Sequence, residues 1–488
     1  MPAFFCFIPL PLADKSDPNF STNPLTNSPN NHKLIIRLGC LRTGLGAARS
    51  CWNTLMKSKI SAIFPLLVLL PLSGKILSGQ GLLIPMDLTQ TDHLKAYGVA
   101  YQALLDNHKV EWLLNYRGGS FLLPPVRSLE EMCRLRGVDC RPVSESQKMD
   151  IYVQVEAGNM ERIELEKAPR LAVYVPPTYD PWDDAVRLAL DYAQVPYSTV
   201  WDEEVLSNAL GQYDWLHLHH EDFTGQFGKF YASFQNADWY KNEVRANNRE
   251  AGKLGFGKVS QLKLAVAQKV RQYLQEGGFL FAMCSAPATL DIALAAHRTD
   301  IVPAEFDGDP ADPRCQERLD YSQTIAFTGF RAITSPMVYE HSDIDVNNTF
   351  DVGAADAALE APASRGPETY FTLFDFSAKY DPVSCMLTQN HAALVREFLG
   401  QDTGFRRTLV KDGIVLLAEV AGSDEVKYLH GLFGKGSFAY MGGHDPEDYQ
   451  HLVGDPPTDL RLHRNSPGYR LILNNILFPA AKKKPLKT

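Results

Sequence analysis

The feature that most constrains the fold of this chain is the alternation of apolar strand-like and helix-like segments between residues 170 and 297. In the helix-like segment 260–278, four apolar residues recur on one face and Gly277 marks the end. Because successive parallel strands need a crossover such as a helix, this alternation predicts a parallel α/β sheet. We expect strands at 170–177, 197–206, 213–222 and 278–284, and helices at 181–194, 260–278 and 287–296.

A shorter alternation precedes this region and predicts a smaller α/β domain, 82–165, also with a parallel sheet. Its expected strands and helices are 82–87, 93–107, 110–116, 128–137 and 138–143. The polar stretch 144–167 is open to two interpretations, a linker or an edge strand at 151–157.

The second domain is expected to span 168–481, with insertions at 223–258 and 298–380 where the alternation is lost. Residues 307–314 and 351–368 are typical of loops, and the α/β pattern returns at 413–420, 435–443 and 467–481. The lysine-rich end, 482–488, is expected to be a solvated basic tail.

The segment 56–80 predicts a secretory signal peptide. Two lysines precede an apolar run that is too short for a transmembrane helix, so we expect export and no stable membrane insertion. Residues 1–55 show no sustained periodicity, and we interpret them as a disordered upstream extension before a start at Met56. The net charge of −9 argues against a nucleic-acid-binding surface.

Cysteine usage adds few constraints. Five of the eight cysteines follow residue 80, and an odd number in an exported chain leaves at least one thiol unpaired. Cys133 and Cys140 are candidates for a local disulfide. The chain has no zinc-ribbon spacing, and we expect no cofactor.

Reactive side chains follow three expected strands, and ligands bind at the carboxyl ends of the strands in open parallel sheets. The first is Cys284, between a strand and a helix. A turn there would expose the thiol, and the positive end of the helix would lower its pKa. Ser285 and Ala286 are small enough to let backbone N–H groups approach an oxyanion. The alternative is a small buried residue that only packs.

The second strand end is LHLHHED, 216–222. Strand alternation places His217 and His219 on one face. His219, His220 and Glu221, together with Ser285, are candidate substrate-binding residues. A metal site at His217, His219, His220 and Glu221 is a further alternative, because imidazole suits zinc and other divalent metals.

The third strand end is GGHDPEDYQH, 442–451. His444 follows an apolar strand, and Asp445 and Glu447 are close enough in sequence to orient its imidazole. A turn that starts a helix at Asp445 accounts for the same residues equally well. Cys284, His444 and a nearby acid would satisfy the scheme of nucleophile, base and orienting group.

With GGFLFAMCSA and GGHDPEDYQH in this order, the chain resembles the class I glutamine amidotransferase-like superfamily. The resemblance implies a flavodoxin-like parallel domain with Cys284 as nucleophile, His444 as base and Glu447 as the acid. The spacing His-Asp-Pro-Glu is one residue longer than that of the family. The C-terminal part is also similar to ThuA-like proteins.

Stretches such as HLKAYGVAY and DWLHLHHEDFTGQFGKF are similar to exported bacterial proteins commonly labelled asparagine synthetase B. Asparagine synthesis is not expected, since no cysteine follows Met1 or Met56 and no Ser-Gly-Gly-x-Asp-Ser loop occurs. The sequence instead suggests a cysteine-dependent amide or ester hydrolase acting on a small molecule. The alternative is a non-catalytic carbohydrate-binding module, for which the aromatic-rich segment 223–240 would supply stacking surfaces.

Overall fold

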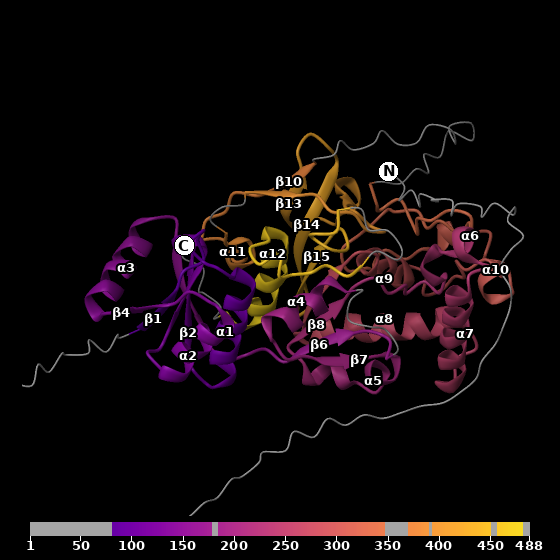
Figure 1. The fold of residues 1–488 in the computed structure, drawn as a ribbon. Coiled ribbons are helices and arrows are strands. Elements are labelled where there is room, and N and C mark those ends of the chain that lie inside the picture. Colours follow the sequence, from indigo (N-terminus) through magenta and orange to yellow (C-terminus); the bar gives the residue numbers. More distant parts are fainter. Residues whose placement is uncertain (1–80, 178–183, 347–368, 390–392, 450–455, 482–488) are drawn as a thin grey trace, which may run out of the picture. The chain divides into compact units, whose positions relative to one another are not determined.

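The computed structural model describes residues 81–481 apart from 178–183, 347–368, 390–392 and 450–455. The predicted extension 1–55, signal peptide 56–80, loop 351–368 and basic tail 482–488 lie outside the described residues. The described part is a mixed α/β structure built on two sheets, which confirms the predicted α/β class (Figure 1).

The first sheet has five strands in the order β4-β1-β3-β2-β5, and every pairing in it is antiparallel. Its strands are β1 Gly81–Ile84, β2 Val110–Leu114, β3 Ser120–Leu123, β4 Arg141–Val143 and β5 Glu161–Leu165. The helices of this region are α1 His93–Leu105, α2 Arg127–Arg136 and α3 Glu145–Ala157.

The parallel sheet predicted for residues 82–165 is therefore wrong. The turn from β2 to β3 covers 115–119, in which Asn115 and Gly119 adopt left-handed φ values of 61° and 88°. Such a short connection joins only antiparallel neighbours, because parallel strands need a long crossover. α1 instead links β1 to β2, which lie on either side of β3. Alternation specified the type of most of these elements, but it missed β3 and did not give the pairing of the strands.

Residues 145–157 form a helix, so neither the linker nor the edge strand predicted there is correct. Ser144 Oγ accepts a hydrogen bond from the Gln147 N–H at 3.3 Å, and Gln147 Oε1 accepts one from the Ser144 N–H at 2.8 Å. This capping box satisfies two backbone donors that would otherwise lack partners and starts α3. The edge strand is β5, which pairs with β2.

The second sheet has ten strands. Along β7-β6-β8-β9-β15 all pairings are parallel, and β15 continues through β14, β13, β10 and β11 in antiparallel pairings. The strands are β6 Leu171–Tyr174, β7 Ser198–Val200, β8 Trp215–Leu218, β9 Phe279–Met283, β10 Tyr370–Leu373, β11 Leu394–Arg396, β12 Phe405–Arg406, β13 Val415–Val420, β14 Glu425–Phe433 and β15 Gly436–Met441.

The antiparallel half was not predicted and makes the sheet mixed. β14 and β15 are joined by only Gly434 and Lys435, and Gly434 has a φ of 61°. A two-residue connection of this kind makes a hairpin, so the chain direction reverses between β14 and β15.

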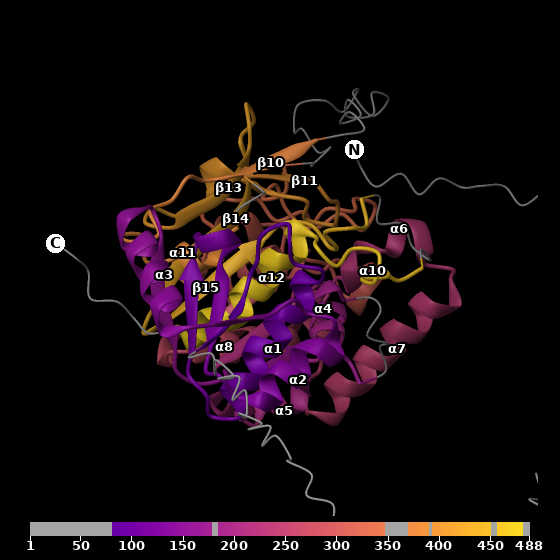
Figure 2. The ribbon, with the colours of Figure 1, turned by 60° about the vertical axis from the view of Figure 1, so that its left-hand side comes forward.

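The parallel strands are buried on both faces. Their side chains alternate between a core shared with α1, α4 and α12 and a core shared with α8 and α9. Figure 2 shows α12 and α1 close together, in agreement with their contacts. The helices of this part are α4 Ala185–Ala193, α5 Asp202–Leu206, α6 Tyr231–Phe234, α7 Asp238–Lys253, α8 Val259–Glu276, α9 Ala286–Ala295, α10 Ala304–Asp307, α11 Ser384–Leu387 and α12 Pro467–Leu477. Within the described residues, no helix is both long and apolar enough to cross a membrane.

Candidate functional site

The candidate site lies at the carboxyl ends of β8, β9 and β15, which are adjacent parallel strands. His219 follows β8, Cys284 follows β9 and His444 follows β15 after two glycines. The Cys284 N–H donates to the Gly443 carbonyl at 3.1 Å, and the Ala286 N–H donates to the His219 carbonyl at 3.1 Å. The structure therefore brings together the three strand ends that the sequence singled out.

Cys284 occupies a tight turn between β9 and α9. Its φ of 53° is in the left-handed region, which costs a non-glycine residue about 1–3 kcal/mol. The surrounding backbone maintains this conformation through the bond from Cys284 to Gly443. The predicted strand–turn–helix arrangement is thus present, with the cysteine at its strained position.

The thiol of Cys284 is not activated in this structure. Only 2% of the residue is exposed, and burial raises the pKa of the thiol to about 12. The backbone N–H groups of Gln401, Ser285 and Asp402 bond to the sulfur and lower the pKa, but the nearby Asp402 carboxylate raises it further. The lowered pKa expected from the helix end is therefore wrong, because removal from water outweighs the local donors.

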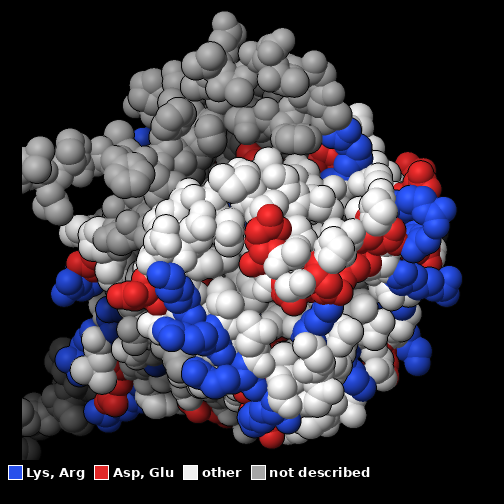
Figure 3. All heavy atoms as spheres, turned by 90° about the vertical axis from the view of Figure 1, so that its right-hand side faces the viewer, with Lys and Arg blue, Asp and Glu red and all other residues white. Residues whose placement is uncertain are grey.

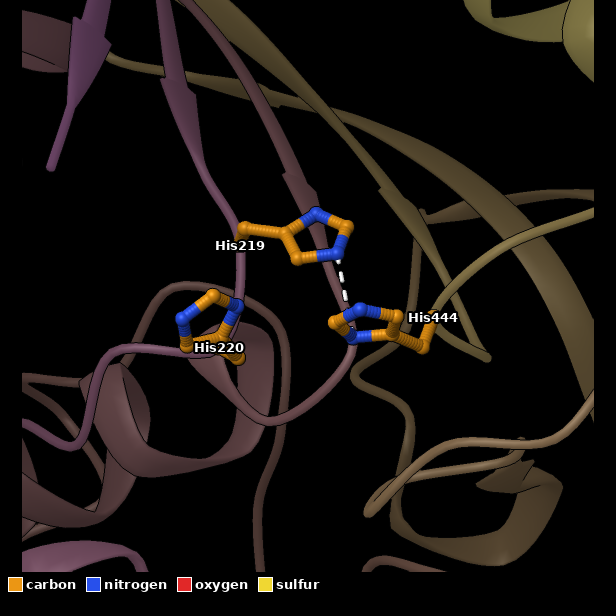
Figure 4. Close-up of side chains that lie close together, drawn as sticks. All are labelled: His219, His220 and His444. Carbon is orange, nitrogen blue, oxygen red and sulfur yellow. Dashed lines mark hydrogen bonds between the residues drawn. The ribbon is translucent and has the colours of Figure 1, made fainter. Parts of the chain in front are cut away.

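A chain of imidazoles runs through the site. Nδ1 of His217 lies 2.9 Å from the Phe281 carbonyl oxygen, and its Nε2 lies 3.2 Å from Nδ1 of His219. Nε2 of His219 lies 3.2 Å from Nδ1 of His444. Figure 4 shows this last contact and places His220 beside it.

A carbonyl oxygen only accepts, so Nδ1 of His217 carries a proton and donates to the Phe281 carbonyl. Nε2 of His217 lies between two groups, Nδ1 of His219 at 3.2 Å and Oδ1 of Asp184 at 3.5 Å. The two ring nitrogens of His219 therefore face His217 on one side and His444 on the other.

Asp184 lies beside the imidazoles of His217 and His219 and was not identified from the sequence. Its Oδ1 lies 3.5 Å from Nε2 of His217 and 3.8 Å from Nδ1 of His219. The same oxygen accepts from the N–H groups of Val186 and Arg187 at 2.8 and 3.0 Å, which caps α4. Burial disfavours its charged form, but His219 and His217 outweigh burial and hold the Asp184 pKa below its usual value. A signal did exist: acidic residues follow the strand 170–177, another carboxyl end of the same sheet.

The remaining predicted binding residues also lie here. Glu221 Oε2 accepts from the His219 N–H at 2.9 Å, and burial raises the Glu221 pKa. Among the described residues, the buried Oε1 of Glu221 and Oγ of Ser285 have no hydrogen-bond partner. His220 is half-buried beside them. Glu221 and Ser285 thus each leave one buried polar atom available for a ligand.

Glu447 has its own partners in the turn after β15. Its carboxylate accepts from the Tyr449 hydroxyl at 2.7 Å and lies 2.9 Å from Nδ1 of His463. Its N–H donates to Asp445 Oδ1 at 2.8 Å, within a turn that does not continue as a helix. The Glu447 carboxylate is thus held by Tyr449 and His463, and the Asp184 carboxylate lies beside the imidazoles of His217 and His219.

Comparisons with known proteins do not identify a family. No family model matches the chain, and no curated protein matches it. Among solved structures, it is similar to Cytoplasmic Protein STM3548 from Salmonella typhimurium, with 10% identity and a TM-score of 0.30, over 64% of this chain and 100% of that one. It is also similar to Cytoplasmic Protein STM1381 from Salmonella typhimurium LT2, with 11% identity and a TM-score of 0.29, over 64% of this chain and 99% of that one.

Proposed function

We propose that this chain is a cysteine-dependent amide or ester hydrolase with a core of the class I glutamine amidotransferase-like kind. Numbered along the chain, the parallel strands β6, β7, β8, β9 and β15 lie in the spatial order 2-1-3-4-5. This is the order of flavodoxin-like sheets, in which ligands bind at the carboxyl ends of the strands. Cys284 and His444 both follow strands of that edge.

The observation that carries the proposal is the strained turn at Cys284, whose N–H donates to the carbonyl of Gly443, the residue that precedes His444. Strain of this kind is retained where the rest of the fold enforces it, and it occurs at nucleophile turns. The Ser285 N–H, which bonds to the Cys284 sulfur in this structure, directly follows the nucleophile in the chain, as an oxyanion-hole donor of a nucleophile elbow does.

The raised thiol pKa determines how the reaction would run. Because the thiol is protonated at neutral pH, its proton must pass to His444 as sulfur attacks the substrate carbonyl carbon. The tetrahedral oxyanion accepts from backbone N–H groups. His444 then protonates the leaving amine or alcohol as the C–N or C–O bond breaks, and water hydrolyses the thioester that remains.

The test is hydrolysis of a panel of chromogenic esters and fluorogenic amides by the full chain and by Cys284→Ala. We expect kcat/KM to fall by at least about a thousandfold in the variant, since the nucleophile is lost. Cys385→Ala, which removes another buried thiol, is the matched control and retains activity. Equal activity in Cys284→Ala and the wild type would refute the proposal.

A carbohydrate-binding role is the second candidate, and a separate cavity favours it. The cavity has a volume of about 440 Å³ and is lined by aromatic side chains beside cationic and amide groups. Phe227, Tyr231, Tyr240 and Phe306 supply its aromatic surface, and none of the imidazoles of the site described above line it. It involves α6, α7 and α10, whose face shows acidic and basic side chains intermixed (Figure 3).

Calorimetric titration with neutral oligosaccharides tests this second role. Binding that weakens about tenfold or more in Tyr231→Ala supports it, because a stacked ring is a large part of such an interface. The exposed Tyr380→Ala is the control and should bind like the wild type. Identical titrations for Tyr231→Ala and the wild type would exclude this cavity.

A further inference from the structure

His219, His220 and His444 bring one ring nitrogen each to a common point. These three nitrogens all lie within 4.8 Å of one another. His219 and His444 are buried, whereas His220 is half-buried. Figure 4 shows the three rings converging from the ends of two strands.

The spacing of two of these nitrogens matches that of metal ligands. Two nitrogens bound to one tetrahedral zinc ion at ~2.0–2.1 Å are about 3.3 Å apart. Nε2 of His219 and Nδ1 of His444 are 3.2 Å apart. A ring nitrogen of His220 lies within 4.8 Å of the other two, so a small movement of its side chain would bring it to a third position.

The neighbours of His219 prepare it as a ligand. When Nδ1 of His219 donates to His217, whose own Nδ1–H donates to the Phe281 carbonyl oxygen, the His219 lone pair is at Nε2. Metal-binding histidines commonly donate their second ring N–H in this way, and the donation fixes the ring orientation. The negative charge of Asp184 lies behind this pair and would offset part of the charge of a cation.

We propose that Nε2 of His219, a ring nitrogen of His220 and Nδ1 of His444 bind one divalent transition-metal ion of the zinc class. Imidazole-only ligation suits Zn²⁺, Co²⁺, Ni²⁺ and Cu²⁺. With the ion on Nδ1 of His444, the neutral ring carries its proton on Nε2. Glu221 follows His220 in the chain, and Ser285 follows Cys284. The buried Oε1 of Glu221 and Oγ of Ser285 would serve as hydrogen-bond partners for a water molecule bound to the ion.

His219 also belongs to a deeper group with Asp184 and His217. We assign the ion to the outer group because all three members of the deeper group are buried. Only the outer group contains a half-buried ligand, His220, through which an ion can enter.

The next step rests on the proposed function: binding of the ion at this site regulates the hydrolase. A neutral imidazole has one lone pair, so His444 cannot bind an ion and accept the Cys284 proton at the same time. Occupancy by the metal and catalysis by the cysteine exclude each other. Metal ions therefore inhibit the hydrolase.

The full chain is stripped with a chelator and titrated with Co²⁺, whose visible absorption reports tetrahedral binding, and with Zn²⁺ by calorimetry. We expect one site, weakened at least about tenfold in His220→Asn and in His444→Asn. His220→Cys keeps a ligand and should retain binding, and His108→Asn, outside the cluster, is the control. Thermal unfolding of each variant verifies that it is folded.

Failure to bind Co²⁺ or Zn²⁺, or unchanged binding in His220→Asn, would overturn the site. Binding lost in Asp184→Asn but kept in His220→Asn would move the ion to the deeper group and also overturn it. Hydrolysis that rises with Zn²⁺ would overturn the inhibition. Metal binding without any cysteine-dependent hydrolysis would reject the proposed function and leave the metal site standing.

Discussion

At the scale of single residues, Cys284 shows how burial decides between competing local effects. Three backbone N–H groups bond to its sulfur, and the start of α9 is adjacent. Each of these favours a thiolate, but the cost of removing the charge from water is larger. The local sequence contains the donors, whereas the degree of burial depends on segments far away, including residues 401 and 402.

Alkylation by iodoacetamide should therefore be slow for Cys284 at pH 7 to 8. Because only the thiolate reacts and the pKa is about 12, the rate should rise about tenfold per pH unit above pH 8 without a plateau, as long as the fold persists. Peptide mass spectrometry measures it, with the half-buried Cys140 as the comparison in the same sample. A plateau below the free-thiol value of about 8.5 would contradict the prediction.

At the scale of elements, α9 anchors a distant loop through one carboxylate. Asp291, fully buried, accepts from the N–H groups of Ile325, Ala326 and Phe327 at 2.7, 2.7 and 2.8 Å. Burial still raises the Asp291 pKa to about 6, because these three bonds only partly offset the loss of water. The residues 325–327 thus take their conformation from a helix about 35 positions earlier.

Asp291→Asn should lower the free energy of unfolding at pH 7 by about 1–3 kcal/mol, because an amide has fewer acceptor sites and its NH₂ faces backbone donors. The folded pKa is raised above the unfolded value of about 4. The stability that Asp291 contributes is therefore fully present below pH 4 and falls as pH rises through about 6.

Urea unfolding between pH 4 and pH 7 measures both effects. The wild type should lose more stability over this range than Asp291→Asn, which lacks the titrating group, and Asp412→Asn provides the control. Parallel pH profiles for the wild type and Asp291→Asn would show that Asp291 has an ordinary pKa.

At the scale of the whole molecule, the two sheets share a core. α1 connects two strands of the first sheet but packs against α4 and α12, which cover the second sheet. The Tyr97 hydroxyl donates to Asn474 Oδ1 at 2.5 Å, and the Arg470 guanidinium donates to the Gly118 carbonyl at 2.6 Å. Helix α12, near the C-terminus, thus completes the packing of the N-terminal sheet.

A fragment of residues 81–167 should therefore not fold alone. Without α4 and α12, the apolar side of α1 that faces them would be exposed to water. The fragment would then lose the hydrophobic burial that is the main driving force for folding. Circular dichroism and heteronuclear NMR of the fragment check this, with the chain 81–488 for comparison. A dispersed spectrum with a cooperative melt would show an independent domain.

Local periodicity predicted several elements to within a few residues. The helix expected at 260–278 is α8, Val259–Glu276, and the strand expected at 278–284 is β9, Phe279–Met283. It also predicted that Cys284, His219 and His444 would lie at one edge, because all parallel strands end at the same edge of a sheet. These features depend on side-chain spacing of two or 3.6 residues, which the chain itself contains.

The sequence by itself thus determined the types of most elements, the α/β class and three of the strand ends that form the site. Only the tertiary structure decided the antiparallel pairing of the first sheet, the position of Asp184 behind His217 and His219, and the contact of Glu447 with His463. Pairing, burial and side-chain partners depend on segments far apart in the chain. The local spacing of side chains carries no information about such long-range contacts. They form only when the cores on both faces of the sheet pack.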